Sequence, residues 1–414
     1  LKAILGKYPI SSKNVNKGKK IAIGGSITAT TQATVLYIPL INNSVKNVGI
    51  YRTSQKNMLP GTWYSADRAD CVPLEDGTYK MTVYSQGHLT SLTFGNNKNL
   101  YEIYHMHHNI TSLYNAFNNC TNLVGSPACG KGVVDMSYAY YNCSNLTGSP
   151  VCGPNVTNMR SAYFYCRNLT GSPIIGDKVT DAVGAYRECY NLKGPAVCGC
   201  NMTSMCQTYA YCQNLTGAAV CGDNITNMNA AYISCNKLTG PAVCGPNVID
   251  FSSAYNSCSN LTGPAACGNK VTNMANAYEY CSNITGSPIC GNNVTNMYNA
   301  YHNCDRLTGI PACGSNVINM SNAYRNCTNL TGQPVCGPNV TIMANAYYYC
   351  TNLTGSAVCG PNETSMYNDY YYCINLTGSA ACGDKVTDMS RAYSYCTKLT
   401  GPAVCAPNVT NMSA

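Results

Sequence analysis

Cysteine is the residue through which this chain could most readily do chemistry, because the sequence of 414 residues holds 28 cysteines. Most of them fall in two series that step along the chain by 23 residues. The first series runs from Cys120 to Cys396, and the second follows nine residues later, from Cys129 to Cys405. Many cysteines usually indicate disulfides or metal sites. The constant step instead predicts two columns of sulfur inside a repeating structure.

The repeat that begins at Cys166 argues against a disulfide within every coil, because Ile175 stands where the partner cysteine would be. An apolar column accepts Ile, and reduced Cys itself packs as a small hydrophobic residue. We therefore predict columns of buried thiols, which suit a reducing compartment or an anaerobic habitat. Bridges between neighbouring coils are the alternative. The residues singled out for this structural ladder are Cys143, Cys152, Cys166, Cys235, Cys244, Cys327 and Cys336.

Cys200 and Cys206 stand outside both columns. With Cys198 and Cys212 they form the pattern C-x-C-x5-C-x5-C, whereas structural zinc sites usually contain cysteine pairs separated by about two to four residues. We expect either a disulfide between Cys200 and Cys206 or two thiols that face solvent. The sequence therefore predicts no metal site and no cofactor.

The sequence lacks the motifs of the common enzyme classes: it contains no Gly-x-Ser-x-Gly, no P-loop and no His-Glu-x-x-His. Carboxylates are few and do not recur in pairs at any phase of the repeat. Glu363 takes a position that holds Val, Ile or Met in other repeats, and we interpret it as a local loosening of one coil. The prediction is a protein that is not an enzyme. The alternative is a catalytic domain beyond these residues.

Tyrosine is the other abundant reactive residue, with 34 in the chain. The two positions before each first-column cysteine vary between repeats and are often aromatic. Tyrosine gives a binding surface rigid contact area and a hydroxyl, so these positions predict a surface that binds protein or glycan. The alternative is that the rings cover a thin core and stack on one another. The candidate residues are Tyr141, Phe164, Tyr165, Tyr211, Tyr280, Tyr348, Tyr349, Tyr371, Tyr372 and Tyr395.

The 23-residue step predicts a solenoid, in which each coil stacks on the next. In the coil of residues 327–349, the segment Leu-Thr-Gly-x-x-Val-Cys is apolar enough for a short parallel strand. Gly-Pro-Asn then suits a turn, and the Val-Thr-Asn-Met of most coils directs two apolar side chains inward. The Ala-Tyr-x-x-Cys spacing predicts a short helical turn that packs Ala, Tyr and Cys inward.

The chain divides by composition into four parts. We predict a basic arm or linker at 1–20, a small β-rich anchoring domain at 21–95, a capping coil at 96–119 and thirteen repeats at 120–414. In the anchoring domain, β-branched and aromatic runs predict strands at 21–27, 33–41, 79–84 and 89–94, with Trp63 as a core anchor.

Charged residues make up 10% of the chain, against roughly 25% in typical domains. Residues 1–95 hold 11 Lys and Arg against 4 Asp and Glu, while the remainder holds 14 against 13. The nearly neutral repeats predict no nucleic-acid partner, which would need a basic stripe. No apolar run reaches the roughly 20 residues of a membrane span, and no secretory signal is visible.

Val-Thr-Asn-Met followed by Ala-Tyr-x-x-Cys-x-x-Leu-Thr resembles the BspA-like leucine-rich repeats of bacterial surface proteins, over residues 97–414. The chain departs from them with Tyr where they favour Phe, and with a second Cys and Gly-Pro-Asn where they often have Ile-Pro. The resemblance implies an α/β-type solenoid, a leucine-rich-repeat-like right-handed coil with one short parallel strand per 23-residue repeat, preceded by the small β-rich domain. Similar repeats occur in phage fibres.

These observations together predict a non-enzymatic recognition or adhesion protein that faces the exterior of a cell or virion. Its tyrosine-rich face would bind a protein or glycan of a host or cell surface, and residues 1–95 would join copies into an oligomer or larger assembly. The alternative is a structural spacer, a phage tail or head fibre, or a filament subunit with no ligand of its own.

Overall fold

The computed structural model describes residues 95–96, 110–402 and 405–413 in full and, before residue 110, the backbone of seven β-strands. Trp63 and the arm at 1–20 lie outside the described residues. The chain forms two compact units, Leu1–Lys193 and Gly194–Ala414, and each is described by itself. In the described part of the chain, no helix is long and apolar enough to cross a membrane.

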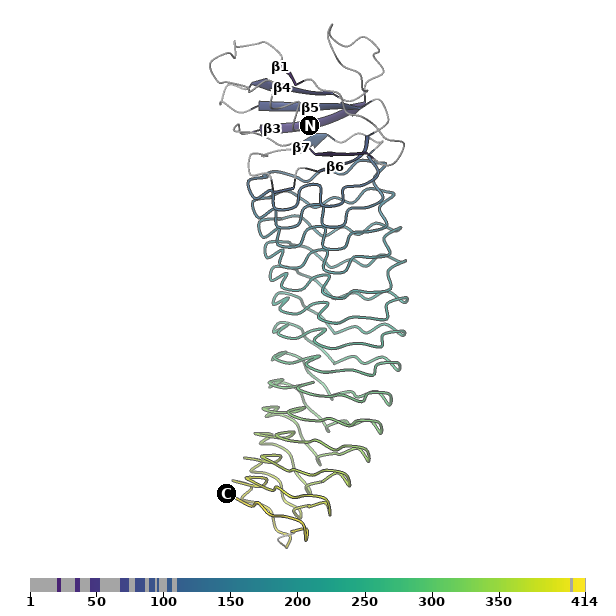
Figure 1. Ribbon diagram of the computed structural model, residues 1–414. Coiled ribbons are helices and arrows are strands. Elements are labelled where there is room, and N and C mark those ends of the chain that lie inside the picture. Colours follow the sequence, from purple (N-terminus) through teal and green to yellow (C-terminus); the bar gives the residue numbers. More distant parts are fainter. Residues whose placement is uncertain are drawn as a thin grey trace. The chain divides into compact units, whose positions relative to one another are not determined.

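The strands form two sheets in the first unit (Figure 1). They are β1 (Ile21–Ile23), β2 (Thr34–Tyr37), β3 (Val45–Arg52), β4 (Arg68–Pro73), β5 (Tyr79–Ser85), β6 (Leu89–Thr93) and β7 (Ile103–His105). One sheet has the order β1-β4-β5-β3-β7, and the other pairs β2 with β6 in parallel. Strands β1, β2, β5 and β6 fall in the four predicted segments. Strands β3, β4 and β7 were not predicted. Polar residues interrupt the apolar runs of β3 and β4, and β7, which pairs with β3, lies in the segment predicted to be the capping coil.

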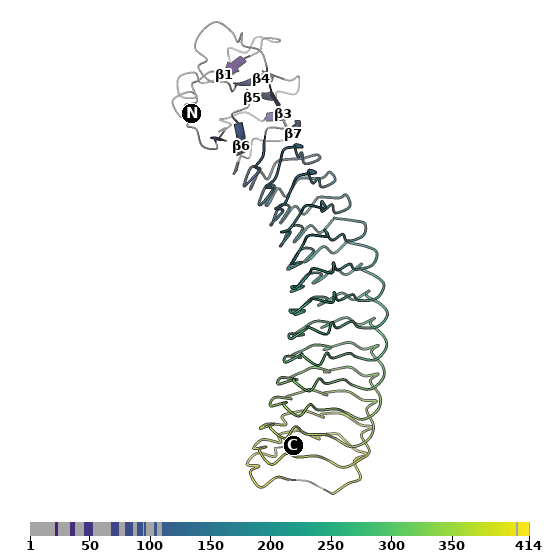
Figure 2. The ribbon, with the colours of Figure 1, turned by 90° about the vertical axis from the view of Figure 1, so that its right-hand side faces the viewer.

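From residue 110 onward the chain winds into coils of 23 residues that lie one on the next within each unit (Figures 1 and 2). Parallel bridges link most neighbouring coils at the third position of Val-Thr-Asn-Met, and one further bridge joins Gly263 to Ile284 in the Leu-Thr-Gly segment. The bridge residues are Ser112, Asp135, Asn158 and Asp181 in the first unit, and Ser204, Asn227, Asp250, Asn273, Asn296, Asn319 and Ile342, then Ser365, Asp388 and Asn411, in the second.

The prediction of a strand at Leu-Thr-Gly-x-x-Val-Cys is therefore wrong in its position. In that segment a buried tyrosine from the same coil takes the main-chain groups that a ladder would need. Val151 shows this clearly: its N–H donates to the Tyr163 hydroxyl at 3.0 Å, and its carbonyl accepts from the same hydroxyl at 2.7 Å. With both groups bonded to a phenol, this stretch forms no continuous pairing with its neighbours.

The predicted helical turn at Ala-Tyr-x-x-Cys is also wrong. The segment consists of tight turns, in which Ala139 N–H donates to Met136 O at 3.0 Å and Cys143 N–H to Tyr140 O at 3.1 Å. Alternate N–H groups, such as that of Tyr140, donate instead to a carbonyl of the next coil. Two residues per coil have left-handed backbone, for example Asn142 with φ of 56°, and they direct these N–H groups along the stack.

The core is a set of columns filled by the same residue type in each coil, as the sequence predicts. In one coil its members are Val156, Met159, Ala162, Tyr163, Cys166 and Leu169, all fully buried. The ring of Tyr163 stacks on Tyr140 at 5.4 Å between centroids and 2° between planes. Because each phenol also bonds main chain, Tyr cannot be exchanged for Phe here without losing hydrogen bonds.

Both cysteine columns hold thiols. In the first, the Cys166 Sγ donates to Tyr140 O of the preceding coil at 3.0 Å, and burial raises its pKa. The second column is half-buried and faces a glycine of the next coil: a Cβ added to Gly153 would lie 2.9 Å from the Cys129 Sγ. Burial raises the pKa of Cys129 to about 12. The glycine is thus required by close packing against sulfur.

Candidate binding surface

The backbone gives the candidate tyrosines an unusual conformation. The position immediately before each first-column cysteine is left-handed in every described coil, with φ of 61° at Tyr165, 61° at Tyr280 and 66° at Tyr372. Other coils place Asn142 or Asn326 there, which suits the left-handed region far better than a bulky residue does. The choice of tyrosine therefore costs conformational energy.

Five of the candidates meet in the second unit and are here called the C-terminal tyrosine cluster: Tyr348, Tyr349, Tyr371, Tyr372 and Tyr395. Tyr348 stacks on Tyr371 at 4.9 Å and 6°, and Tyr349 on Tyr372 at 4.5 Å and 7°. Tyr395 meets Tyr371 edge-on at 5.4 Å and is 57% exposed. Stacked rings cover one another's faces, so this cluster presents ring edges and hydroxyls to solvent, with an open ring at Tyr395.

Three further candidates form an N-terminal aromatic cluster in the first unit. Tyr141 stacks on Phe164 at 4.9 Å and 4°, and Tyr165 meets Phe164 edge-on at 4.4 Å. Guanidinium groups cover this cluster: Arg187 lies 5.0 Å from the Phe164 centroid and Arg167 lies 5.1 Å from that of Tyr165. Cation–π contacts of this kind hold both arginines against the rings.

Glu188 ties this cluster together electrostatically. Its carboxylate accepts from Arg167 at 3.3 Å and from the Tyr190 hydroxyl at 2.9 Å. The charge of Glu188 raises the pKa of the Tyr165 phenol, and burial together with the same carboxylate raises the pKa of Tyr190. These phenols therefore remain protonated hydrogen-bond donors at neutral pH.

The two remaining candidates, Tyr211 and Tyr280, stand apart from both clusters. Tyr280 is 49% exposed, and its column neighbours in the adjacent coils are Ser257 and Asn303. Its ring contacts His302 in a tilted arrangement at 5.3 Å. The structure thus brings eight of the ten candidates together, in two separate clusters.

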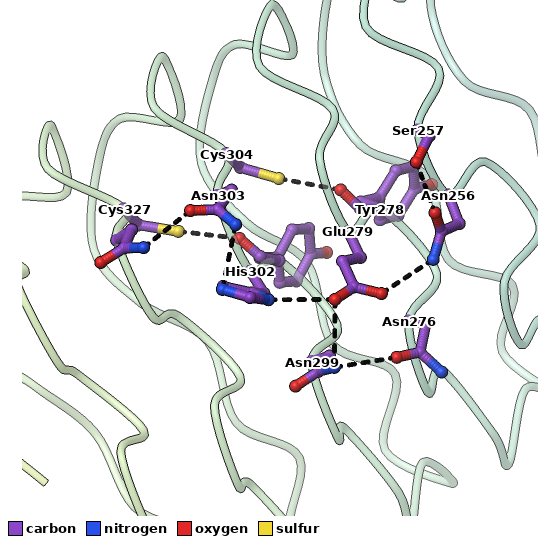
Figure 3. A network of polar contacts seen from close by, with 12 residues as sticks. Asn256, Ser257, Asn276, Tyr278, Glu279, Asn299, His302, Asn303, Cys304 and Cys327 are labelled. Carbon is purple, nitrogen blue, oxygen red and sulfur yellow. Dashed lines mark hydrogen bonds and ion pairs between the residues drawn. The ribbon is translucent and has the colours of Figure 1, made fainter. Parts of the chain in front are cut away.

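A polar network centred on Glu279 and His302 was missed by sequence reasoning (Figure 3). Glu279 Oε1 lies 3.0 Å from His302 Nδ1, and Glu279 Oε2 accepts from Asn256 Nδ2 at 2.8 Å. His302 Nε2 lies 3.0 Å from Asn303 Nδ2, so the ring carries its proton on Nδ1 and donates to Glu279. The signal was available: Glu279 and His302 occupy the same variable position in consecutive coils.

A buried acidic pair lies in the coil that holds Tyr371. Glu363 and Asp369 are both fully buried and occupy columns that hold Val and Ala in neighbouring coils. Burial raises the pKa of both carboxyls, and the charge of Glu363 raises that of Asp369 further. The Cys359 thiol donates to Glu363 Oε2 at 3.1 Å. Sequence reasoning singled out Glu363 but missed Asp369, although it departs from its column in the same coil.

The predicted loosening at Glu363 is visible in the backbone. Among the described residues of the second unit, the ladder of parallel bridges is interrupted between Ile342 and Ser365, the step that leads into this coil. The bond that Thr341 N–H makes to Ile318 O in the preceding coil also has no counterpart at Thr364. Two carboxyls in place of smaller apolar side chains thus disturb one inter-coil junction.

The side chains described here form no group of three or more His, Cys, Asp or Glu arranged to hold a metal. Cys200 is an exposed thiol, and Cys206 is a half-buried thiol whose Sγ lies 3.6 Å from Asn229 Oδ1. Of the two alternatives drawn from the sequence, the structure therefore has the thiols and not the local disulfide.

Comparison with known proteins finds solved structures of low similarity. No family model matches the sequence, and no curated protein matches it. A leucine rich cell surface protein from Faecalibacterium prausnitzii is 17% identical, with a TM-score of 0.36, over 87% of this chain and 96% of its own. A leucine-rich repeat protein from Bacteroides ovatus is 12% identical, with a TM-score of 0.41, over 88% of this chain and 83% of its own. The stacked 23-residue coils themselves make this chain a leucine-rich-repeat-type solenoid.

Proposed function

We propose that this chain is a non-enzymatic recognition or adhesion protein of a cell or virion surface, which binds protein or glycan through its variable tyrosines. One observation carries the proposal: tyrosine recurs at a left-handed position where Asn is conformationally cheaper. Residues held in such regions cluster at functional sites, where another requirement outweighs the strain. These tyrosines are Tyr165, Tyr211, Tyr280, Tyr349, Tyr372 and Tyr395.

Stacking between rings offsets part of this strain, since an aromatic pair contributes about 0.5–1.5 kcal/mol. This favours a second candidate function, a stiff spacer or fibre subunit in which the rings only brace the coils. Tyr280 weighs against it, because this ring is half exposed and its column neighbours are Ser257 and Asn303. A bracing role would not select tyrosine there.

The test replaces tyrosine by the residue that the same backbone position holds in other coils. We expect Tyr349→Asn with Tyr372→Asn to fold with a stability within about 1.5 kcal/mol of the parent, because lost stacking and relieved strain oppose each other. Binding of the labelled protein to a printed glycan array and to cultured epithelial cells should fall at least about tenfold, a loss of about 1.4 kcal/mol.

The matched control is Tyr298→Asn with Tyr367→Asn, which removes two exposed tyrosines from positions outside the left-handed column. This variant should bind like the parent chain. If both double variants bind equally well, the tyrosine face is not the recognition surface and the spacer is favoured.

A further inference from the structure

Arg325 occupies the variable surface column directly before the C-terminal tyrosine cluster. Its guanidinium lies 4.7 Å from the centroid of Tyr348, and the side chain is half-buried. Elsewhere in the chain, Arg160 and Arg167 are each paired with a carboxylate, at 2.9 and 3.3 Å. No carboxylate pairs with Arg325 among the residues that the structure describes.

Two polar atoms at this position are also buried without a partner. They are Arg325 Nε itself and the side-chain carbonyl oxygen of Asn322, three residues before it. Asn322 is joined to the arginine through its main chain, since Arg325 N–H donates to Asn322 O at 3.2 Å. Buried polar groups without partners are costly and call for an explanation such as a bound ion, water or ligand.

We propose that Arg325 is the anchor of a subsite for an anionic sugar, and that it binds the carboxylate of an acidic glycan. A guanidinium held over a ring loses much of its freedom to move, and its planar donor fork matches a carboxylate through two parallel hydrogen bonds. The proposal rests on the proposed function, because the glycan would extend over the hydroxyls of Tyr349 and Tyr372. It adds the chemical class of the ligand.

The neighbouring groups favour a sugar over an acidic peptide. The guanidinium lies over the phenol ring of Tyr348, which Tyr349 follows in the chain, and the amide residue Asn322 is bonded to the main chain of Arg325. Amides and phenols can donate to and accept from the hydroxyls of a sugar ring. They form no apolar recess of the kind that holds a peptide side chain.

The experiment compares two forms of one polymer, polygalacturonate and its fully methyl-esterified form, which differ only in the carboxylate. The full chain should bind the acid at least about tenfold more tightly than the ester. Arg325→Gln should remove this preference, whereas Arg306→Gln, which removes the same charge from an exposed arginine of the same unit, should keep it. Circular dichroism checks that both variants fold.

Several results would overturn the assignment. They are equal binding of acid and ester, binding of neither polymer, equal effects of the two arginine variants, and stronger competition by poly-glutamate or dextran sulfate than by polygalacturonate. Failure of the proposed function looks different. If Tyr349→Asn with Tyr372→Asn leaves binding of both polymers intact while Arg325→Gln abolishes the preference, the anionic subsite stands and the tyrosine face does not.

Discussion

The buried tyrosine column shows how one hydroxyl sets the structure of a coil. The Tyr301 hydroxyl donates to Ile289 O at 2.6 Å and accepts from Ile289 N–H at 3.1 Å. Phenylalanine would remove both of these part-buried hydrogen bonds, at a cost of about 0.5–1.5 kcal/mol each. Phe117 occupies this column where the described coils begin. Tyrosine in place of the Phe of related repeats therefore has a structural cause.

Glu363 and Asp369 make the stability of their coil depend on pH. Burial raises both pKa values above their ordinary range, so the stabilising neutral forms are present below the ordinary carboxyl pKa and are lost as pH rises through the raised values. As the pH rises from the ordinary carboxyl pKa of about 4, the parent chain should therefore lose stability relative to Glu363→Val with Asp369→Ala. The difference in melting temperature, measured at increasing pH, should reach a few degrees.

The isosteric variant Glu363→Gln with Asp369→Asn separates charge from packing, because it keeps both shapes and cannot ionise. Its melting temperature should depend on pH in the same way as the melting temperature of the apolar variant. A parent chain whose difference curve is flat would show that the pair does not ionise in the folded protein.

At the scale of one coil, the side chains of Asn and Thr add a second set of hydrogen bonds between neighbouring coils. The Thr226 hydroxyl donates to Thr203 O at 3.1 Å, and Asn224 Nδ2 donates to Cys200 O at 3.0 Å. Such bonds recur along the stack and make up for the small number of parallel bridges between coils.

The exposed cysteines should differ in reactivity from the buried and half-buried members of the two columns. Iodoacetamide at about pH 8 should modify the exposed Cys200 and Cys405 first, because the thiolate is the reactive form and burial raises the pKa of column members such as Cys143 and Cys244. Peptide mapping by mass spectrometry measures the order. Unfolded, unreduced protein in which most sulfurs are bonded in pairs would contradict the thiol columns.

The buried columns could be predicted because Leu, Cys, Tyr and Met recur at a fixed step, and a fixed step in a solenoid means a shared environment. The left-handed turns could not be predicted from the sequence. A left-handed backbone position is usually recognised by Asn or Gly, and this column holds Tyr165 and Glu188 as readily as Asn142. The pairing of Glu363 with Asp369 also required the structure, because five residues without helix or strand lie between them.

At the scale of the whole chain, the repeat predicts that the chain still folds after a whole coil is deleted but not after part of a coil is deleted. Deletion of residues 212–234 joins Tyr211 to Cys235 and keeps every column in phase. We expect this variant to fold with the circular dichroism of the parent and a slightly lower melting temperature, because stability in such arrays is nearly a sum over neighbours.

Deletion of residues 212–222 removes about half a coil and is the control. It places apolar residues at surface positions and should give a different spectrum and a non-cooperative melt. Equal behaviour of the two deletions would mean that stacking in phase does not determine the fold.

The stacked tyrosines also give this protein an optical property. Tyr232 and Tyr255 lie 5.4 Å apart at 8°, and Tyr301 and Tyr324 lie 5.5 Å apart at 3°. At such separations, light absorbed by one phenol migrates to the next before it is re-emitted. Nitration of a single ring would quench the fluorescence of its neighbours as well. The loss of ultraviolet fluorescence would therefore measure over how many coils the stack of rings is continuous.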